Sequence, residues 1–206
     1  MIQGSDEWFA ARLGRVTASR VSDVMAKTKT GYSASRTNYM MELLCQRMTG
    51  KREESFTSAA MQRGTELEPA ARACYEAESG LLVVECGLVI HPEIDGLGAS
   101  PDGLVGDDGL LEIKSPNTAT HIEFIRTGKP KAEYQWQMLC QMACTGRAWC
   151  DFVSYDDRLP PALQYHSVRM ERDDSRIAEM VLEVTKFLAE LDALEQDMRG
   201  RMAVDA

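Results

Sequence analysis

The sequence predicts a fold of the α/β (α+β) class, with a central mixed β-sheet flanked by helices. Stretches with three- and four-residue spacing of apolar residues are typical of helices, and they fill the first 80 residues and the C-terminus. Short runs rich in Val and Leu lie between them, as expected for strands. The chain has 206 residues, of which 44% are apolar and 27% charged, and no linker divides it. We therefore expect a single domain over residues 1–206.

The first part of the chain is predicted to be helical. Ser5 is placed to cap a short helix that ends near Leu13, and Thr17 to cap a second one that ends near Met25. Residues 27–33 are polar and basic, which predicts a mobile loop. Longer helices are expected over residues 36–49 and 57–79, ended by Gly50 and Gly80, the second bent at Pro69.

Strands dominate after residue 80. The predicted strands are residues 81–90, 97–105, 110–113, 149–155 and 165–170, with a helix over 131–145. The final segment, 173–199, is predicted to be an amphipathic helix because apolar residues recur from Ile177 to Leu194 at helical steps. We expect this helix to close over the core, with a subunit contact as the alternative.

The charge is unevenly distributed along the chain. The net charge of −9 comprises +4 over residues 1–63, −9 over 64–119, +2 over 120–150 and −6 over the remainder. An acidic block between basic ones suits a cation site set in a surface that binds phosphates, although chance unevenness accounts for it equally well. No apolar run approaches the roughly 20 residues of a membrane-spanning helix. The first residues lack a signal-peptide pattern, so we expect a cytoplasmic protein without a membrane partner.

Asp102, Glu112 and Lys114 form the most informative constellation. Glu112 and Lys114 are two residues apart on a predicted strand and therefore share one face. A three-residue loop, Asp107–Gly109 with Gly109 left-handed, would pair Asp102 with Lys114 and bring all three side chains to that face. Two carboxylates and a lysine so placed predict a site for Mg²⁺, which prefers oxygen ligands and bridges to phosphate. A surface salt-bridge trio is the alternative.

These residues match the pattern Pro-Asp…Glu-x-Lys of the PD-(D/E)xK nucleases, and other blocks of sequence surround them in a fixed order. The blocks are Trp8, Arg12-Leu13-Gly14, Thr17-Ala18-Ser19, Arg63-Gly64-Thr65-Glu66-Leu67-Glu68, Ser100-Pro101-Asp102-Gly103, Glu112-Ile113-Lys114 and Tyr134-Gln135-Trp136-Gln137. Together they resemble the YqaJ-like viral recombinase family, to which phage lambda exonuclease belongs. The resemblance implies a restriction-endonuclease-like core.

The resemblance also implies roles for individual residues. Asp102, Glu112 and the carbonyl of Ile113 would hold Mg²⁺, with Mn²⁺ as a possible substitute. Glu68 would reach the same site from a helix as a further acidic ligand. Lys114 would be the catalytic lysine and Gln137 would line the site. A pocket for a terminal 5′-phosphate would be formed by Arg12, Ser19 and Ser100, whose guanidinium and hydroxyl groups suit a phosphate.

The activity implied is a metal-dependent 5′→3′ exonuclease that degrades one strand of linear double-stranded DNA and leaves a 3′ overhang for recombination. A homotrimeric ring and a single-strand DNA annealing protein are the implied partners. We add the hypothesis that Lys27 and Lys29 contact the duplex. Two alternatives stay open: a structure-specific or endonucleolytic nuclease with the same core, and a DNA-binding module without catalysis.

The cysteines and histidines carry less information. The spacing of Cys140, Cys144 and Cys150 approaches that of iron–sulphur nucleases but lacks their C-x₂-C step, so buried structural thiols are expected. The three histidines are far apart in the sequence, and His121 is expected at the surface or near DNA.

Overall fold

The computed structural model describes residues 2–52 and 58–204, and it contains two main sheets and a hairpin. The larger sheet has the order β10-β9-β8-β7-β4, and the smaller one β1-β6-β5. The strands of the larger sheet are β4 (Val83–Val84), β7 (Gly103–Val105), β8 (Gly109–Lys114), β9 (Trp149–Tyr155) and β10 (Tyr165–Glu171). Those of the smaller sheet are β1 (Val16–Thr17), β5 (Val89–His91) and β6 (Ile94–Ala99). Because β8 and β9 are parallel and the other neighbours in the larger sheet antiparallel, the predicted mixed sheet is confirmed.

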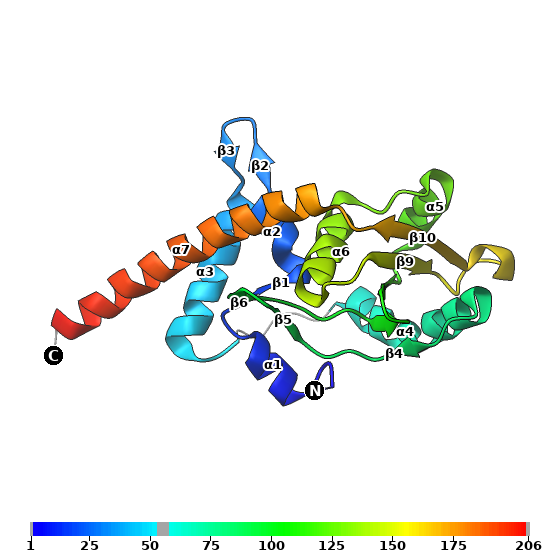
Figure 1. The fold of residues 1–206 in the computed structure, drawn as a ribbon, viewed down its shortest axis with the longest axis horizontal. Coiled ribbons are helices and arrows are strands. Elements are labelled where there is room, and N and C mark those ends of the chain that lie inside the picture. The colour runs from blue at the N-terminus through cyan, green and yellow to red at the C-terminus, as the bar shows by residue number, and fades with distance from the viewer. Residues whose placement is uncertain (1, 53–57, 205–206) are drawn as a thin grey trace.

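Helices surround the sheets (Figure 1). The α-helices are α1 (Asp6–Arg12), α2 (Val21–Met25), α3 (Ala34–Thr49), α4 (Ala59–Ser79), α5 (Thr118–Thr127), α6 (Ala132–Thr145) and α7 (Asp174–Val204). Two short 3₁₀ helices are η1 (Ala18–Arg20) and η2 (Pro161–Leu163). None of the helices in the described part of the chain is long and apolar enough to cross a membrane.

Local capping sets several helix ends where the sequence predicts them. The Ser5 hydroxyl accepts a hydrogen bond from the Trp8 amide and opens α1. Gly50 and Gly80 end α3 and α4 in the left-handed conformation, which residues with a Cβ rarely adopt. Pro69 lies inside α4 as expected. Residue 57, with which this helix was predicted to begin, lies outside the described residues.

Helix α7 covers the core with one face. It begins one residue later than predicted and continues past the predicted end at 199. Its buried residues recur at helical spacing and pack against α2 and α3: they are Ile177, Met180, Val184, Phe187, Leu188 and Leu191. Leu194, the last apolar residue of the predicted stripe, is partly exposed. In Figure 1 the C-terminal end of α7 extends beyond the rest of the molecule.

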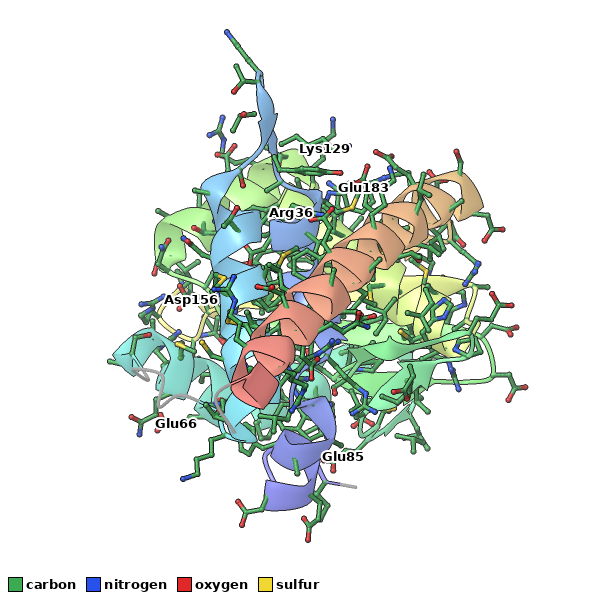
Figure 2. All side chains as sticks on the ribbon, turned by 90° about the vertical axis from the view of Figure 1, so that its left-hand side faces the viewer. Arg36, Glu66, Glu85, Lys129, Asp156 and Glu183 are labelled. Carbon is green, nitrogen blue, oxygen red and sulfur yellow. The ribbon has the colours of Figure 1, made fainter. Side chains whose placement is uncertain are left out.

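The basic segment 27–33 is a β-hairpin and not an irregular loop. Strand β2 (Lys27–Thr28) pairs with β3 (Gly31–Tyr32), and the hairpin projects from the upper side of the molecule in Figure 1. Its base is fixed to α7, because Lys27 Nζ and Tyr32 Oη contact the two oxygens of Glu183 at 3.0 and 2.6 Å. Below it, Arg36 of α3 is buried and forms two hydrogen bonds with Glu190 of α7 (Figure 2).

Three further elements differ from the sequence-based prediction. The predicted strand 81–90 is divided between the two sheets as β4 and β5, and the strand 97–105 as β6 and β7. Helix α5 was not predicted at all, although Asn117 caps its first turn and Gly128 ends it. Seven of its ten residues are Thr, Ile, His or Phe, types with modest helix propensity, so packing must stabilise it.

Candidate active site

Asp102 and Glu112 lie side by side where strands β7 and β8 pair. The Asp102 amide donates to the Leu111 carbonyl at 3.1 Å, and Asp102 Oδ2 accepts a hydrogen bond from the Ile113 amide at 2.6 Å. Gly103 is the partner of Leu111 in this ladder, so Asp102 falls opposite Glu112. Paired residues on antiparallel strands point to the same face, and both carboxylates therefore share one side of the sheet.

The register that places them there differs from the predicted one. Asp102 was predicted to pair with Lys114 across the loop Asp107–Gly109, but Val105 pairs with Gly109 and the loop is residues 106–108. The left-handed residue is Gly106 (φ 52°), not Gly109. A Cβ at Gly109 would overlap the Trp149 ring, so close packing explains that glycine. The predicted pairing of the two strands is wrong by two residues, and a shift of two residues leaves each side chain on the same face of the sheet. Asp102, Glu112 and Lys114 therefore still share one face.

Glu112 is held in one position by three donors. Its carboxylate is 0% exposed. Gln137 Nε2 donates to Oε1 at 2.7 Å and Gln141 Nε2 to Oε2 at 2.5 Å. Lys114 completes the set with an ion pair to Oε1. Gln137 thus lies at the site as predicted and positions Glu112, whereas Gln141 was not identified from the sequence.

The electrostatics of the pair favour a bound cation. Burial and the neighbouring charge of Glu112 raise the pKa of Asp102 well above its usual value. Burial lowers the pKa of Lys114, but the charges of Glu112 and Asp102 outweigh burial and raise it above the ordinary lysine value. Two adjacent carboxylates with a single lysine leave negative charge uncompensated in a region shielded from water. Oxygen ligands with this charge fit a hard divalent cation such as Mg²⁺.

Glu68 lies near this pair but is bound elsewhere. From α4 it forms an ion pair at 2.9 Å with Arg72, whose guanidinium also contacts the Asp102 carbonyl at 3.5 Å. The charge of Glu68 contributes to the raised pKa of Asp102. Among the described residues, no three His, Cys, Asp or Glu side chains are grouped as metal ligands. The structure therefore brings together Asp102, Glu112 and Lys114 and leaves Glu68 beside them.

Arg12, Ser19 and Ser100 lie around a neighbouring basic region. Ser100 Oγ accepts hydrogen bonds from Trp8 Nε1 at 2.9 Å and from Arg12 Nη1 at 3.3 Å, and Arg12 also stacks on the Trp8 ring. Arg12 and Ser19 line a cavity of about 690 Å³. The other basic residues that line it are Arg15, Arg20 and Arg52.

This cavity has the electrostatic character of an anion site. Burial, together with the charge of Arg52, lowers the pKa of Arg12 to about 10. Arg12 stays protonated at neutral pH, and no described residue gives it a carboxylate partner. A half-buried guanidinium next to hydroxyl groups is suited to a phosphate.

Lys27 and Lys29 occupy different environments on the β2–β3 hairpin. Lys27 is paired with Glu183, so part of its charge is neutralised. Lys29 lies in the turn between the two strands and is exposed. Of the two, Lys29 has the charge available to a phosphate.

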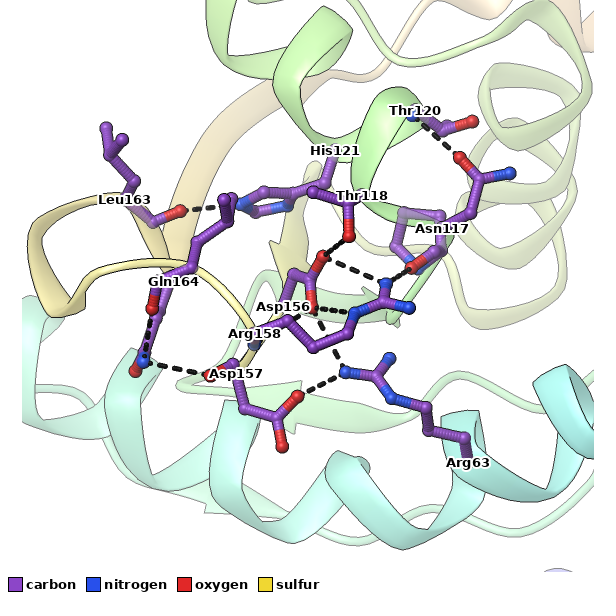
Figure 3. Close-up of polar contacts among 12 residues, drawn as sticks. Arg63, Asn117, Thr118, Thr120, His121, Asp156, Asp157, Arg158, Leu163 and Gln164 are labelled. Atoms are coloured by element: carbon purple, nitrogen blue, oxygen red, sulfur yellow. Dashed lines mark hydrogen bonds and ion pairs between the residues drawn. The ribbon is translucent and has the colours of Figure 1, made fainter.

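A second polar network borders the site at the end of β9 (Figure 3). Asp156 is fully buried and accepts hydrogen bonds from Arg158, Arg63 and Thr118. His121, expected at the surface, is wholly buried, and its ring nitrogens contact Ser154 Oγ at 2.7 Å and the Leu163 carbonyl at 2.8 Å. His121 is buried because it lies on helix α5, which was not predicted. Its contact with Ser154 holds α5 against β9.

The cysteines are placed as the sequence predicted. Cys140, Cys144 and Cys150 are buried free thiols. The thiol of Cys140 lies beside that of Cys144, and this hydrogen bond together with burial raises its pKa. Such thiols are unreactive, which agrees with a packing role.

Comparisons with known proteins agree with this geometry. Residues 7–148 match the YqaJ-like viral recombinase domain. The fold is similar to that of an alkaline exonuclease from Laribacter hongkongensis, with a TM-score of 0.92, 64% identity, and coverage of 98% of this chain and 100% of that one. A structure of the exonuclease in complex with dAMP matches with the same TM-score and coverage at 63% identity.

A phage-related exonuclease from Haemophilus somnus 129PT has a TM-score of 0.74 at 16% identity, with coverage of 89% of this chain and 96% of that one, which shows the shared fold alone. No curated protein sequence matches.

Proposed function

Because the chain belongs to the YqaJ-like viral recombinase family and its 64% identical relative is an alkaline exonuclease, we propose that this exonuclease is Mg²⁺-dependent and acts 5′→3′ on one strand of linear double-stranded DNA. The observation that supports this most is the pair of Asp102, half-buried, and Glu112, fully buried, with Lys114 in contact with Glu112, next to a cavity lined by Arg12. Ser100, which accepts a hydrogen bond from Arg12, is two residues before Asp102, so a strand with its 5′-phosphate at Arg12 would pass next to the carboxylates.

The residues of the carboxylate pair have distinct tasks in this reaction. Asp102 and Glu112, with the Ile113 carbonyl, would hold Mg²⁺. Glu68 is near enough for its negative charge to act on Asp102 and would add to the attraction for the cation. A metal ion held there would lower the pKa of a coordinated water and would stabilise charge on the phosphate. Gln137 and Gln141 fix both oxygens of Glu112, so this ligand needs no reorientation. Lys114 orients the attacking water or helps to remove its proton.

The bonding changes explain why a 5′-phosphate pocket is useful. The water oxygen bonds to phosphorus, the bond from phosphorus to O3′ of the terminal nucleotide breaks, and O3′ gains a proton. A 5′-mononucleotide leaves, and the shortened strand keeps a 5′-phosphate. Each cycle thereby regenerates the group that Arg12, Ser19 and Ser100 bind. The relative's complex with dAMP agrees with a mononucleotide product.

Further parts of the proposal follow from the family. We propose a homotrimeric ring around the DNA, which permits many cycles without tight base contacts, and a single-strand DNA annealing protein as partner on the 3′ overhang. Lys27 and Lys29 are proposed to contact the duplex. We also propose that the protein acts in the cytoplasm as one domain.

The test uses linear duplex DNA labelled separately at each end, with Mg²⁺, Mn²⁺ or EDTA. Mg²⁺-dependent release of nucleotides from the 5′ end, faster with 5′-phosphate than with 5′-hydroxyl, is the expected result. Internal cuts, or equal cleavage rates for DNA with a 5′-phosphate and DNA with a 5′-hydroxyl, would favour an endonucleolytic or structure-specific nuclease. DNA binding without cleavage in either metal would contradict a catalytic role.

A further inference from the structure

A cavity of about 260 Å³ opens beside Lys114, on the opposite side of strand β8 from Asp102. It is lined by Pro116, which follows β8, by Phe152 and Ser154 of β9, and by Tyr134 of α6. Strands β7 and β9 flank β8 on opposite sides, and Asp102 and Ser100 precede β7. The carboxylate pair therefore lies between this cavity and the region of Arg12 and Ser100.

Aromatic and proline rings line much of this cavity. The half-buried Tyr134 ring stacks on Phe152, with ring centroids 5.3 Å apart and an interplanar angle of 24°. Phe124 of α5 meets Phe152 edge to face at 5.0 Å. Pro116 and Pro130 add apolar surface. Surfaces of this kind bind nucleobases, because every base has a flat face that stacks on an aromatic ring.

The rim of the cavity is positively charged. Lys129 and Lys131 both line it and are exposed, and no described carboxylate forms an ion pair with either. Glu123 also lines the cavity, but it is paired with Arg126 at 3.2 Å. Helices α5 and α6 begin here, and their N-terminal ends add positive potential. Figure 2 shows Lys129 on the upper side of the molecule, from which the β2–β3 hairpin also projects.

We propose that this cavity takes the base of the nucleotide on the 3′ side of the scissile phosphate, and that Lys129 and Lys131 contact the phosphates that follow it. The proposal rests on the proposed function, which places the terminal nucleotide between the Arg12 cavity and the carboxylate pair. The next nucleotide must then continue past Lys114, toward the aromatic walls. The volume is below the roughly 300–1,000 Å³ of sites for whole small molecules, which suits a single base.

Such a site would hold the DNA strand in a fixed position during hydrolysis. Tyr134 connects it to the reaction, since Lys114 Nζ lies 5.5 Å from the centre of its ring. A base stacked beside Tyr134 would fix the adjacent phosphate near Lys114. After the cut, the same nucleotide carries the new 5′-phosphate and moves by one step to the Arg12 cavity.

The test combines a protein variant with a missing base. Duplexes with an uncleavable first 5′ linkage carry one abasic nucleotide at the first, second, third or fourth position, and the dissociation constant is measured with wild type and with Tyr134→Leu. For wild type, we expect the abasic nucleotide at the second position to weaken binding about tenfold. Tyr134→Leu should weaken binding of intact DNA by a similar factor and lose sensitivity at that position only.

A second variant tests the cavity without removing a packed side chain, in case Tyr134→Leu does not fold. Ala119 is exposed and lines the cavity, so Ala119→Leu narrows the opening without disturbing the core, and it should show the same loss of sensitivity. Ala189→Leu, at an exposed position on α7, is the matched control and should behave as wild type.

The outcomes separate this proposal from the proposed function. Equal abasic sensitivity in wild type and Tyr134→Leu, or no sensitivity at the second position, would overturn the base site, and the cavity would then be a protein-docking site or a gap in packing. In that case wild type would still shorten linear DNA from its 5′ end. Failure of wild type to do so would overturn the proposed function itself.

Discussion

Gln141 donates a hydrogen bond from Nε2 to Oε2 of Glu112 at 2.5 Å, and this bond joins helix α6 to strand β8. Gln137, one helical turn earlier, makes the equivalent bond to Oε1. The two amides therefore fix both oxygens of a carboxylate that has no access to solvent. A buried carboxylate held in this way has a defined orientation before a metal or DNA arrives.

Replacing Gln141 should weaken the metal site. In Gln141→Leu the carboxylate loses one donor and can rotate, so we expect about a 10- to 100-fold loss of metal affinity or activity. Mn²⁺ binding measured by calorimetry gives a readout that does not depend on turnover. Gln164→Leu, which removes an amide bound to backbone carbonyls far from the carboxylates, is the control and should leave Mn²⁺ affinity unchanged. Unchanged affinity in Gln141→Leu as well would show that Gln137 alone positions Glu112.

Lys114→Ala should abolish cleavage and spare DNA binding. The ammonium contacts Glu112 and lies where it can orient the attacking water, a role worth about 10²–10⁴-fold in rate. Single-turnover cleavage and a binding titration measure the two effects separately. Lys186→Ala, a partly exposed lysine on α7, should cleave at the wild-type rate. Normal cleavage by Lys114→Ala would contradict the proposed mechanism.

The helices were easier to predict than the strands because local interactions set their ends. Ser5, Gly50 and Gly80 act on residues within one turn. The strand predicted over 81–90 failed for the opposite reason. Val83–Val84 pairs with β7 and Val89–His91 with β6, and these partners lie in different sheets. A hydrophobic run alone does not carry that information.

The site was predicted as far as sequence spacing determines it. Alternation along β8 put Glu112 and Lys114 on one face, and the two-residue error in register kept Asp102 with them. Gln141 is four residues after Gln137 and so shares its helix face. The sequence does not reveal that this face of α6 meets β8, because that contact depends on tertiary packing.

Arg12 should decide the preference for a 5′-phosphate. Arg12→Gln keeps a polar side chain and removes the charge, so the rate advantage of 5′-phosphate over 5′-hydroxyl ends should fall about tenfold or more. Initial rates on the two substrates measure it. Arg199→Gln on α7 is a control outside the cavity, because that guanidinium is bound to Glu195 at 2.8 Å. A preserved preference in Arg12→Gln would place the phosphate elsewhere.

Lys29 should contribute more to DNA binding than Lys27. Lys29→Ala removes an exposed charge and should lower the slope of log affinity against log salt by about one. Lys27→Ala should change that slope less, since Lys27 is already paired with Glu183. Arg201→Ala, an exposed cation near the end of α7, is the control. No change in either lysine variant would exclude the hairpin as a DNA contact.

Asp156 should make the stability of the protein depend on pH. Burial raises the pKa of Asp156, but hydrogen bonds from Arg158 and Thr118 outweigh burial and hold that pKa well below its usual value. A carboxyl group whose pKa is lower when folded stabilises the protein above the unfolded-state pKa, near 3.9. That stabilisation is lost as the pH falls toward the folded-state pKa. Asp156→Asn should therefore cost about 2 kcal/mol of unfolding free energy at pH 7, and the difference from wild type should shrink below about pH 4.

Denaturant unfolding from pH 7 to pH 3 measures this difference. Asp157→Asn is the matched control, because Asp157 is partly exposed and its carboxylate pairs with Arg63. Exposed pairs contribute about 0–1 kcal/mol, so its effect should be small at every pH. If Asp156→Asn and Asp157→Asn had equal effects, the buried network around Asp156 would not be what fastens α5 beside the site. Lysines 129 and 131 would then need another element to hold them at the cavity rim.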